Sequence, residues 1–308
     1  MNERTPPQAP DGKRPDPLGP HSAHPGYRIP QCLTIAGSDS GGGAGVQADL
    51  KAMQANGVFG LSVLTSITAQ NTKEVVTAED LPVEIIRAQL RAVFCDFEIG
   101  AIKTGMLSSA DIVVAVSEFL EDQEALPPLV VDPVMISKSG YSLLRDEAIA
   151  AVKERLLPLA KVVTPNRHEA ELLSSVSISG PESLAEAAAR ILELGTESVL
   201  IKGGHLEEVE ATDYLFRRGS SSDAPELVAR FSSPRWATRA THGTGCTFSA
   251  AIAARLALGH ELDFAIREAK EYVSSAIRYG LGIGHGHGPT DHFYFLRSWY
   301  RETEGTDV

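Results

Sequence analysis

The stretch Thr241-His-Gly-Thr-Gly-Cys-Thr-Phe-Ser-Ala-Ala-Ile-Ala-Ala254 has the pattern of a loop that breaks into a helix. Gly243 and Gly245 lack a Cβ atom, so the backbone there can bend sharply and approach a ligand closely. The run from Phe248 to Ala257 consists largely of strong helix formers. We therefore expect a tight glycine turn, followed by a helix whose first turn carries a cysteine.

Thr244 and Thr247 are candidate caps for the start of this helix. A helix start leaves backbone N–H groups without partners and carries the positive end of the helix dipole, so it attracts anions. The same field should lower the pKa of the Cys246 thiol. We hypothesise that the loop stabilises a transferring phosphoryl group and that Cys246 is the base beside it. The alternative is a tight turn that holds a small buried cysteine.

The composition indicates an ordinary soluble globular protein, with 308 residues, 43% hydrophobic and 22% charged. The net charge of −12 argues against nucleic acid or an anionic membrane as the main partner. No apolar run reaches membrane-spanning length. Cys32, Cys95 and Cys246 are too few and too scattered for a disulfide framework or a zinc site, which favours a reduced, cytoplasmic location.

The first 30 residues carry eight of the 18 prolines and almost no aliphatic residues. They lack the apolar core of a signal peptide, and their acidic residues disfavour a transit peptide. We expect residues 1–29 to be a disordered proline-rich tail and residues 30–308 to form a single domain.

From residue 29 onward, short apolar runs alternate with amphipathic helical patterns. The predicted strands are Cys32–Ala36, Leu61–Thr65, Ile99–Lys103, Leu129–Asp132, Lys161–Thr164 and Val199–Lys202, with possible antiparallel edge strands at Asp213–Arg217 and Leu227–Phe231. The predicted helices are Gly45–Ala55, Val83–Phe94, Ala110–Leu120, Asp146–Leu157, Glu182–Leu194, Thr244–Leu258 and Phe264–Tyr279. Continuous Val/Ile/Leu strands separated by helices indicate a three-layer α/β/α sandwich with a mostly parallel central sheet.

Polar or glycine-rich residues follow each of the six main predicted strands. In such sheets, ligands gather at the carboxyl ends of the strands, so these segments should share one edge. The segments are Gly37–Gly45, Gln70–Thr72, Thr104–Met106, Asp132–Met135, Pro165–Asn166 and Gly203–His205.

The first glycine cluster does not match the common phosphate loops. Gly41 and Gly43 would need a third glycine at position 46 for the dinucleotide fingerprint, and Val46 is there. No Walker A sequence exists in the chain. The cluster could still shape a small-molecule pocket. Asp49, on the following helix, could hydrogen-bond a ligand amine or hydroxyl, or it could be a solvated carboxylate favoured by the helix dipole.

Four further polar residues have a functional interpretation, and three of them also have a structural one. Gln70 offers an amide that both donates and accepts, or it is a turn residue. Asp132 and Glu169 are acceptors suited to magnesium, which prefers few carboxylates together with water and phosphate oxygens. Glu169 could equally be an N-terminal helix carboxylate. Lys202 could reach a phosphate, or it could stay solvated at a strand end.

A histidine-containing glycine segment, residues 280–288, lies near the carboxyl end. It brings His285 and His287 close in sequence to Asp291 and His292. This ligand spacing is loose for a metal site and no cysteine joins it, so a flexible glycine loop is the better interpretation.

The ordered motifs of the chain resemble those of the hydroxymethylpyrimidine and phosphomethylpyrimidine kinases of thiamine biosynthesis, which belong to the ribokinase-like superfamily. The resemblance covers residues 30–295. Sugar kinases of the superfamily have an aspartate as the base where this chain has Cys246, so a sugar kinase is disfavoured. The motifs are IAGSDSGGGAGVQADLK, TAQNT, KTGML, VVDPVM, TPNRHEAELL, KGGH, HGTGCTFSAAIAA and GHGHGP.

The resemblance implies a role for each residue that matches a family motif. The positions that bind the aminopyrimidine are Gly37, Asp49, Gln70, Met106 and Val134. The positions that handle the phosphates of ATP are Asn166, Lys202 and the catalytic loop Gly243, Thr244, Gly245 and Cys246. The positions near Mg²⁺ are Asp132 and Glu169.

The resemblance further implies a cytoplasmic, homodimeric, bifunctional enzyme that uses ATP and Mg²⁺ on a small pyrimidine. Cys246 would accept the proton of the substrate hydroxyl in the first transfer. In the second transfer the attacking phosphate oxygen is already anionic, so the base should matter less. Pyridoxal or pyridoxine kinase remains the alternative activity, and a catalytically inactive pyrimidine-phosphate-binding module is the alternative from another class.

Overall fold

The computed structural model of the chain describes residues 28–135, 144–203, 210–219 and 225–297. The predicted N-terminal tail, residues 1–29, lies outside the described residues except for its last two positions. Gly204 and His205, in the last of the predicted strand-end segments, also lie outside them. Among the helices of the described ranges, none is long and apolar enough to cross a membrane.

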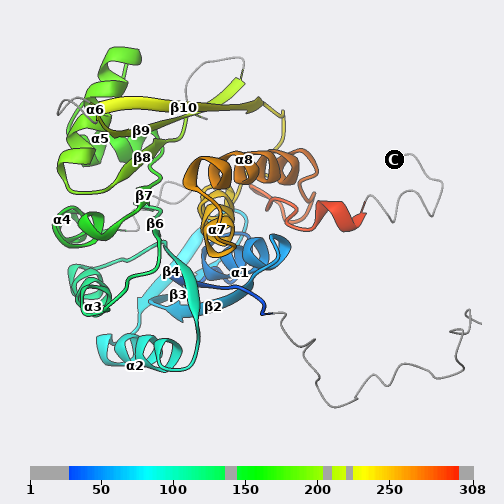
Figure 1. The fold of residues 1–308 in the computed structure, drawn as a ribbon. Helices are drawn as coiled ribbons and strands as arrows, with labels where there is room; N and C mark the ends of the chain where they lie inside the picture. The colour runs from blue at the N-terminus through cyan, green and yellow to red at the C-terminus, as the bar shows by residue number, and fades with distance from the viewer. Residues whose placement is uncertain (1–27, 136–143, 204–209, 220–224, 298–308) are drawn as a thin grey trace, which may run out of the picture.

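An eight-stranded sheet lies at the centre of the structure (Figure 1). Its strands are β1 (Gln31–Ala36), β2 (Phe59–Leu64), β5 (Ile99–Thr104), β6 (Leu129–Val131), β7 (Val162–Val163), β8 (Ser198–Ile201), β9 (Glu210–Arg218) and β10 (Pro225–Pro234). They lie in the order β10-β9-β8-β7-β6-β5-β1-β2. In this order, the strands from β8 through to β2 all pair in parallel. At the edge, β9 pairs antiparallel with both β8 and β10. The predicted mostly parallel sheet is confirmed.

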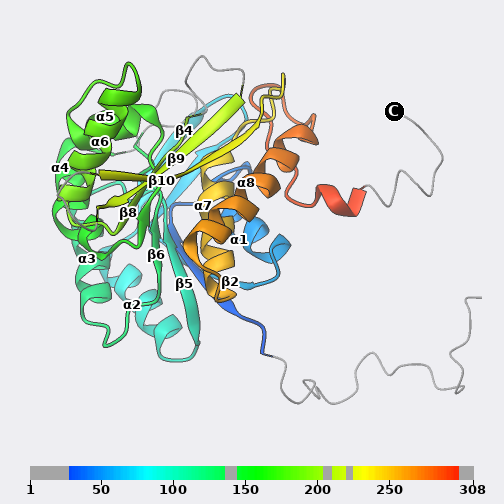
Figure 2. The same cartoon turned by 45° about the horizontal axis from the view of Figure 1, so that its top comes forward.

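Helices cover both faces of this sheet, as Figures 1 and 2 show. On one face lie α1 (Gly45–Ala55), α7 (Thr244–Ala257) and α8 (Leu262–Arg278), with α7 packed between the other two. On the opposite face lie α2 (Val83–Phe94), α3 (Ala110–Glu121), α4 (Asp146–Ala151), α5 (Arg167–Ser174) and α6 (Pro181–Glu193). The predicted three-layer α/β/α sandwich is confirmed.

Two apolar cores fill the spaces between the layers. Successive strand residues point to opposite faces of a sheet, and neighbours in β1 and β5 enter different cores. Cys32 and Ala101 pack toward α1, α7 and α8, whereas Leu33 and Ile102 pack toward α2 to α6. The central strands are therefore buried on both faces, which is why they are continuous apolar runs rather than alternating ones.

A second, two-stranded sheet was not predicted as strands. It consists of β3 (Ser66–Gln70) and β4 (Val75–Asp80), paired antiparallel. The turn between them is closed by Asn71, whose side-chain oxygen accepts hydrogen bonds from the backbone N–H groups of Lys73 and Glu74 at 2.8 and 3.1 Å. Gln70 therefore lies on a hairpin outside the main sheet, rather than in a loop directly after β2.

Two helical segments differ from the prediction. The helix expected over Asp146–Leu157 is α-helical only to Ala151, continues as a π-helix over Val152–Leu156 and ends in a 3₁₀ turn. Pro158 lies in that turn, has no N–H to continue the hydrogen-bond ladder and so stops the helix. The short helix α5 was not predicted, because its eight residues leave little room for a periodic apolar pattern.

Candidate functional site

A cavity of about 840 Å³ opens at the carboxyl edge of the parallel strands. Its size is within the range of small-molecule sites. The structure brings together there every predicted site residue except Asp49. These lining residues are Gly37, Gln70, Met106, Asp132, Val134, Asn166, Glu169, Lys202, Gly243, Thr244, Gly245 and Cys246.

The start of α7 is capped by Gly243 and not, as predicted, by a threonine side chain. Gly243 adopts a φ of +74°, and a Cβ atom there would lie 1.7 Å from the carbonyl oxygen of Gly43. The Thr244 hydroxyl instead donates to the Thr241 carbonyl at 2.8 Å, and Thr247 Oγ1 lies 3.0 Å from a ring nitrogen of His292. Without a side-chain cap, the first N–H groups of α7 are available to an anion.

Cys246 lies where the starts of α1 and α7 meet. The backbone N–H of Gly45, in the first turn of α1, acts to lower the pKa of the Cys246 thiol. The expectation of a lowered pKa is nevertheless wrong: burial raises the pKa of the Cys246 thiol to about 12, although Lys103 opposes the shift. Desolvation of a thiolate therefore outweighs the favourable field of the two helix starts and the lysine.

Lys103 is a site residue that the sequence did not single out. It is fully buried and lines the cavity, and its Nζ atom forms an ion pair of 2.7 Å with Asp49 Oδ2. Asp49 also accepts a hydrogen bond of 2.6 Å from the Thr34 hydroxyl and lies behind the lysine. Burial opposes the charge on Lys103, but Asp49 and Cys246 raise its pKa above the ordinary value, so the ammonium stays charged.

The position of Asp49 excludes the solvated carboxylate that the sequence left open, because its side chain is fully buried. Its predicted direct contact with the pyrimidine stays a prediction. Lys103 had a signal of its own: it is two residues after Ala101 in β5, so it points toward α1 and α7 as Ala101 does.

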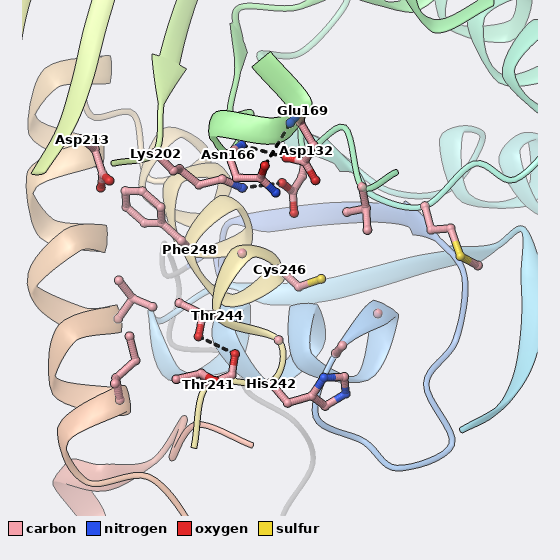
Figure 3. Close-up of a pocket in the computed structure, with 18 of the residues that line it drawn as sticks. Asp132, Asn166, Glu169, Lys202, Asp213, Thr241, His242, Thr244, Cys246 and Phe248 are labelled. Carbon is pink, nitrogen blue, oxygen red and sulfur yellow. Dashed lines mark hydrogen bonds and ion pairs between the residues drawn. The ribbon is translucent and has the colours of Figure 1, made fainter. Parts of the chain in front are cut away.

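Asp132, Asn166, Glu169 and Lys202 form a polar cluster on the side of Cys246 opposite Thr241 and His242 (Figure 3). Lys202 Nζ contacts Asp132 Oδ1 at 2.9 Å, so the lysine is not merely solvated at its strand end. The Asn166 side chain accepts from the Glu169 N–H at 2.9 Å, and Glu169 Oε2 accepts from the Asn166 N–H at 2.8 Å. This capping box begins α5. Glu169 is therefore an N-terminal helix carboxylate, which is the structural interpretation that the sequence left open.

The two buried carboxylates of this cluster fit a divalent cation. Burial raises the pKa of Glu169 to about 7; Lys202 lowers it and Asp132 raises it. A cation would relieve the repulsion between Asp132 and Glu169, and Mg²⁺ needs only one or two carboxylates besides phosphate oxygens and water. In the described ranges, no three His, Cys, Asp or Glu side chains are grouped so as to hold a metal ion, either at this cluster or at the C-terminal histidines.

Asp39 and His242 organise the glycine loop after β1, and sequence reasoning missed both. The Asp39 carboxylate accepts hydrogen bonds from the N–H groups of Gly41, Gly43 and Ala44 at 2.8 to 3.0 Å. A ring nitrogen of His242 lies 2.8 Å from the same carboxylate. Burial opposes the charge, but His242 and the N–H groups of Ala44 and Gly41 hold the pKa of Asp39 below its ordinary value.

The end of the cavity that α8 borders is lined by apolar side chains and by a buried ion pair. Phe248, Val273 and Ile277 border it from α7 and α8. Lys270 Nζ and Asp213 Oδ2 are 2.7 Å apart there, and both residues line the cavity. Figure 3 shows Asp213 and Phe248 at this end, beyond Lys202.

Comparisons with known proteins identify the relatives of this chain. A hydroxymethylpyrimidine/phosphomethylpyrimidine kinase of Haemophilus influenzae is 46% identical over 272 residues, which cover 87% of this chain and 98% of that protein. A thiamine biosynthesis bifunctional protein of Geobacter sulfurreducens is 48% identical over 260 residues, which cover 84% of this chain and 51% of that longer protein.

The fold is shared with a solved ADP complex of Bacillus subtilis pyridoxal kinase. The TM-score is 0.78 at 37% identity, and the match covers 88% of this chain and all of that one. The family model of phosphomethylpyrimidine kinase matches residues 39–291, which include every cavity residue described above except Gly37. The chain therefore belongs to the phosphomethylpyrimidine kinase family and is a phosphotransferase with the ribokinase-like fold.

Proposed function

We propose that the chain transfers phosphoryl groups from ATP twice, first to the hydroxyl of 4-amino-5-hydroxymethyl-2-methylpyrimidine and then to the resulting monophosphate. The diphosphate made in the second step is a precursor in thiamine diphosphate biosynthesis. The observation that carries the proposal is the glycine turn that opens α7 beside Cys246, in a chain of this family. The names of the H. influenzae and G. sulfurreducens relatives support both steps and the pathway.

The pyrimidine is assigned to the part of the cavity that Gly37, Gln70, Met106 and Val134 border. Gln70 can donate to a ring nitrogen and accept from an amino group. The absence of a side chain at Gly37 leaves room for Met106, since a Cβ atom at Gly37 would lie 2.2 Å from its Cε. Asp49 would act through Lys103, with which it is paired.

The phosphates of ATP are assigned to Asn166, Lys202 and the N–H groups of residues 243–246. Lys202 supplies a positive charge and the start of α7 supplies oriented N–H donors. Mg²⁺ is assigned to Asp132 and Glu169, where it would neutralise charge on the phosphoryl oxygens. The B. subtilis relative, solved with ADP, supports a nucleotide in this fold.

In the first transfer the substrate hydroxyl oxygen attacks the γ-phosphorus, the bond from that phosphorus to the β,γ-bridging oxygen breaks, and ADP leaves. The hydroxyl proton passes to the sulfur of Cys246. Lys103 and the starts of α1 and α7 favour the thiolate that this requires. The positive end of α7 also stabilises the transferring group, which is where most of the catalysis of phosphoryl transfer arises.

The test is a substrate panel with ATP and Mg²⁺, in which phosphorylated products are identified by mass and by ³¹P NMR. We expect the hydroxymethylpyrimidine and its monophosphate to be phosphorylated with the highest kcat/KM. Pyridoxal belongs in the panel because a structural relative is a pyridoxal kinase. A clear preference for pyridoxal would reverse the order of the two activities. A complete lack of ADP release with every substrate would favour an inactive binding module.

Three further properties belong to this proposal. A homodimer is supported by the exposed apolar residues Ile67 and Val76 on the β3–β4 sheet, which are 44% and 66% exposed. A cytoplasmic location is supported by three free cysteines. Residues 30–308 would form the single kinase domain. Sedimentation velocity at micromolar concentrations tests the dimer, and a monomer would contradict it.

A further inference from the structure

The glycine segment near the carboxyl end, residues 280–288, donates three backbone hydrogen bonds to Thr72, in the turn of the β3–β4 hairpin. The Thr72 hydroxyl oxygen accepts hydrogen bonds from the backbone N–H groups of His285 and Gly286 at 3.2 and 3.1 Å. The Thr72 carbonyl oxygen accepts a third from the His287 N–H at 2.8 Å. Three consecutive backbone N–H groups therefore converge on one threonine. The side chains of both histidines are exposed, so the segment acts here through its backbone.

The glycines of this segment are shaped to Thr72. Gly284 has a φ of +74°, and a Cβ atom there would lie 2.4 Å from Thr72 Cγ2. A Cβ atom at Gly286 would lie 2.0 Å from the Thr72 carbonyl oxygen. At Gly282, by contrast, a Cβ atom would meet nothing within 4 Å. Glycine is thus required at the two positions that face the threonine and not at a neighbouring one.

The other end of the segment is joined to His242, the residue directly before the catalytic loop. The His242 N–H donates to the Gly288 carbonyl at 3.0 Å, and His242 forms an isolated parallel bridge with Pro289. His242 directly precedes Gly243, the cap of α7. Residues 284–289 therefore span from the hairpin to the phosphoryl-transfer loop.

Gln70 connects this arrangement to the substrate. It precedes Thr72 by two residues, lines the cavity, and its amide nitrogen lies 3.3 Å from a ring nitrogen of His242. Its backbone is also held by Ser40: the Gln70 N–H donates to Ser40 Oγ and the Ser40 hydroxyl donates to the Gln70 carbonyl, both at 2.7 Å. The direction of the Gln70 side chain thus depends on where the hairpin is held.

We propose that Thr72 is a positioning residue that fastens the β3–β4 hairpin to residues 284–289 and so sets Gln70 against the pyrimidine, in register with the catalytic loop. This role rests on the proposed function, because it concerns the pyrimidine that Gln70 binds. The GHGHGP motif then has a positioning role, and it binds neither a metal nor a phosphate. Loss of the fastening should weaken binding of the pyrimidine and leave the binding of ATP unchanged.

The experiment compares Thr72→Val, which removes the hydroxyl acceptor, with Thr72→Ser, which keeps it. A second pair compares Gly286→Ala, which collides with the Thr72 carbonyl, with Gly282→Ala in the same segment. We expect Thr72→Val and Gly286→Ala to raise the KM for hydroxymethylpyrimidine at least fivefold, with the KM for ATP within twofold of wild type. Thr72→Ser and Gly282→Ala should keep both constants within twofold.

Amide hydrogen exchange reports the contact independently of activity. The N–H groups of residues 285 and 286 should exchange faster in Thr72→Val than in Thr72→Ser. Faster exchange with an unchanged KM for the pyrimidine would overturn the positioning role, as would an equal rise in the KM for ATP. A wild-type enzyme that does not phosphorylate the pyrimidine would overturn the proposed function and this inference together.

Discussion

Cys246 is subject to two opposing influences. The starts of α1 and α7 and the ammonium of Lys103 favour a thiolate, whereas burial favours the neutral thiol and raises its pKa to about 12. A thiol with a pKa raised this far is a poor base at neutral pH, but it becomes a strong one when deprotonated. Its contribution should therefore depend on which atom attacks and on the pH.

Replacement of Cys246 with serine should separate the two phosphorylations. The first requires a proton to leave a hydroxyl, whereas the second starts from an anionic phosphate oxygen. We expect Cys246→Ser to lower kcat for hydroxymethylpyrimidine by about 100-fold or more, as for loss of a general base, and to lower the second kcat much less. Steady-state kinetics with each substrate measure this.

The matched control is Cys95→Ser, because Cys95 is an exposed free thiol at the end of α2. This variant should retain both activities. Equal losses in the two steps of Cys246→Ser would leave the thiol with a structural role only.

The pH dependence of the first step follows from the direction of the Cys246 shift. Because the pKa is raised to about 12, the thiolate fraction increases throughout the range below that value. We expect kcat for hydroxymethylpyrimidine to rise with pH between 7 and 9, by up to about tenfold per unit. The monophosphate loses its second proton near pH 6, so the second step should be nearly flat in that range. Parallel pH profiles for the two substrates would contradict a thiolate base.

The helix α7 begins and ends with a glycine in the left-handed region. Gly243 has a φ of +74° and Gly259 a φ of +83°. At the carboxyl end, the N–H groups of Gly259 and His260 donate to the carbonyls of Leu256 and Arg255 in a Schellman arrangement. Only the first glycine also contacts another segment closely, namely the carbonyl of Gly43.

The two glycines provide a matched pair of alanine variants. Gly259→Ala adds only the strain of a positive φ and should lower the free energy of unfolding by about 1 kcal/mol, with activity retained. Gly243→Ala adds the same strain and a collision with the Gly43 carbonyl, so the catalytic loop must move. We expect about a 100-fold loss of kcat, the size seen when an oriented N–H donor is lost. Urea unfolding and kinetics measure both, and an active Gly243→Ala enzyme would contradict the proposed loop.

The sequence predicted well those elements whose signals are local. The bounds of α1 and α2 coincide with the predicted ranges, and the glycine turn before α7 lies where the motif placed it. The hairpin β3–β4 was missed because it is short and is held by residues 285–287, more than 200 positions away.

The same reason explains the missed site residues. Lys103 is paired with Asp49 across 54 positions, and His242 with Asp39 across 203. A local pattern shows a lysine at a strand end or an aspartate in a glycine loop, but not the partner that buries it. The pKa of Cys246 was mispredicted because sequence reveals the helix start and not the depth of burial.

All residues assigned to the site lie between Gly37 and Lys202 or in the loop that opens α7. The family match begins at residue 39 and so includes none of the N-terminal segment. Residue 28 makes an ion pair with Glu98, but the two side chains are 82% and 77% exposed, so this pair contributes little to stability. These facts predict that the first 27 residues are dispensable for catalysis.

Deletion of residues 1–27 should therefore leave kcat/KM for both pyrimidines within twofold and the Tm within about 2 °C, since the residues that form the site and the two apolar cores described above all follow residue 31. Deletion of residues 1–36 is the contrasting variant, because it removes β1, which pairs with β2 on one side and β5 on the other. Loss of that central strand exposes both apolar cores, so this protein should not fold. Differential scanning calorimetry and the two-substrate kinetic assay distinguish the variants. Loss of activity in the shorter deletion, with its Tm unchanged, would mean that the N-terminal segment takes part in the site.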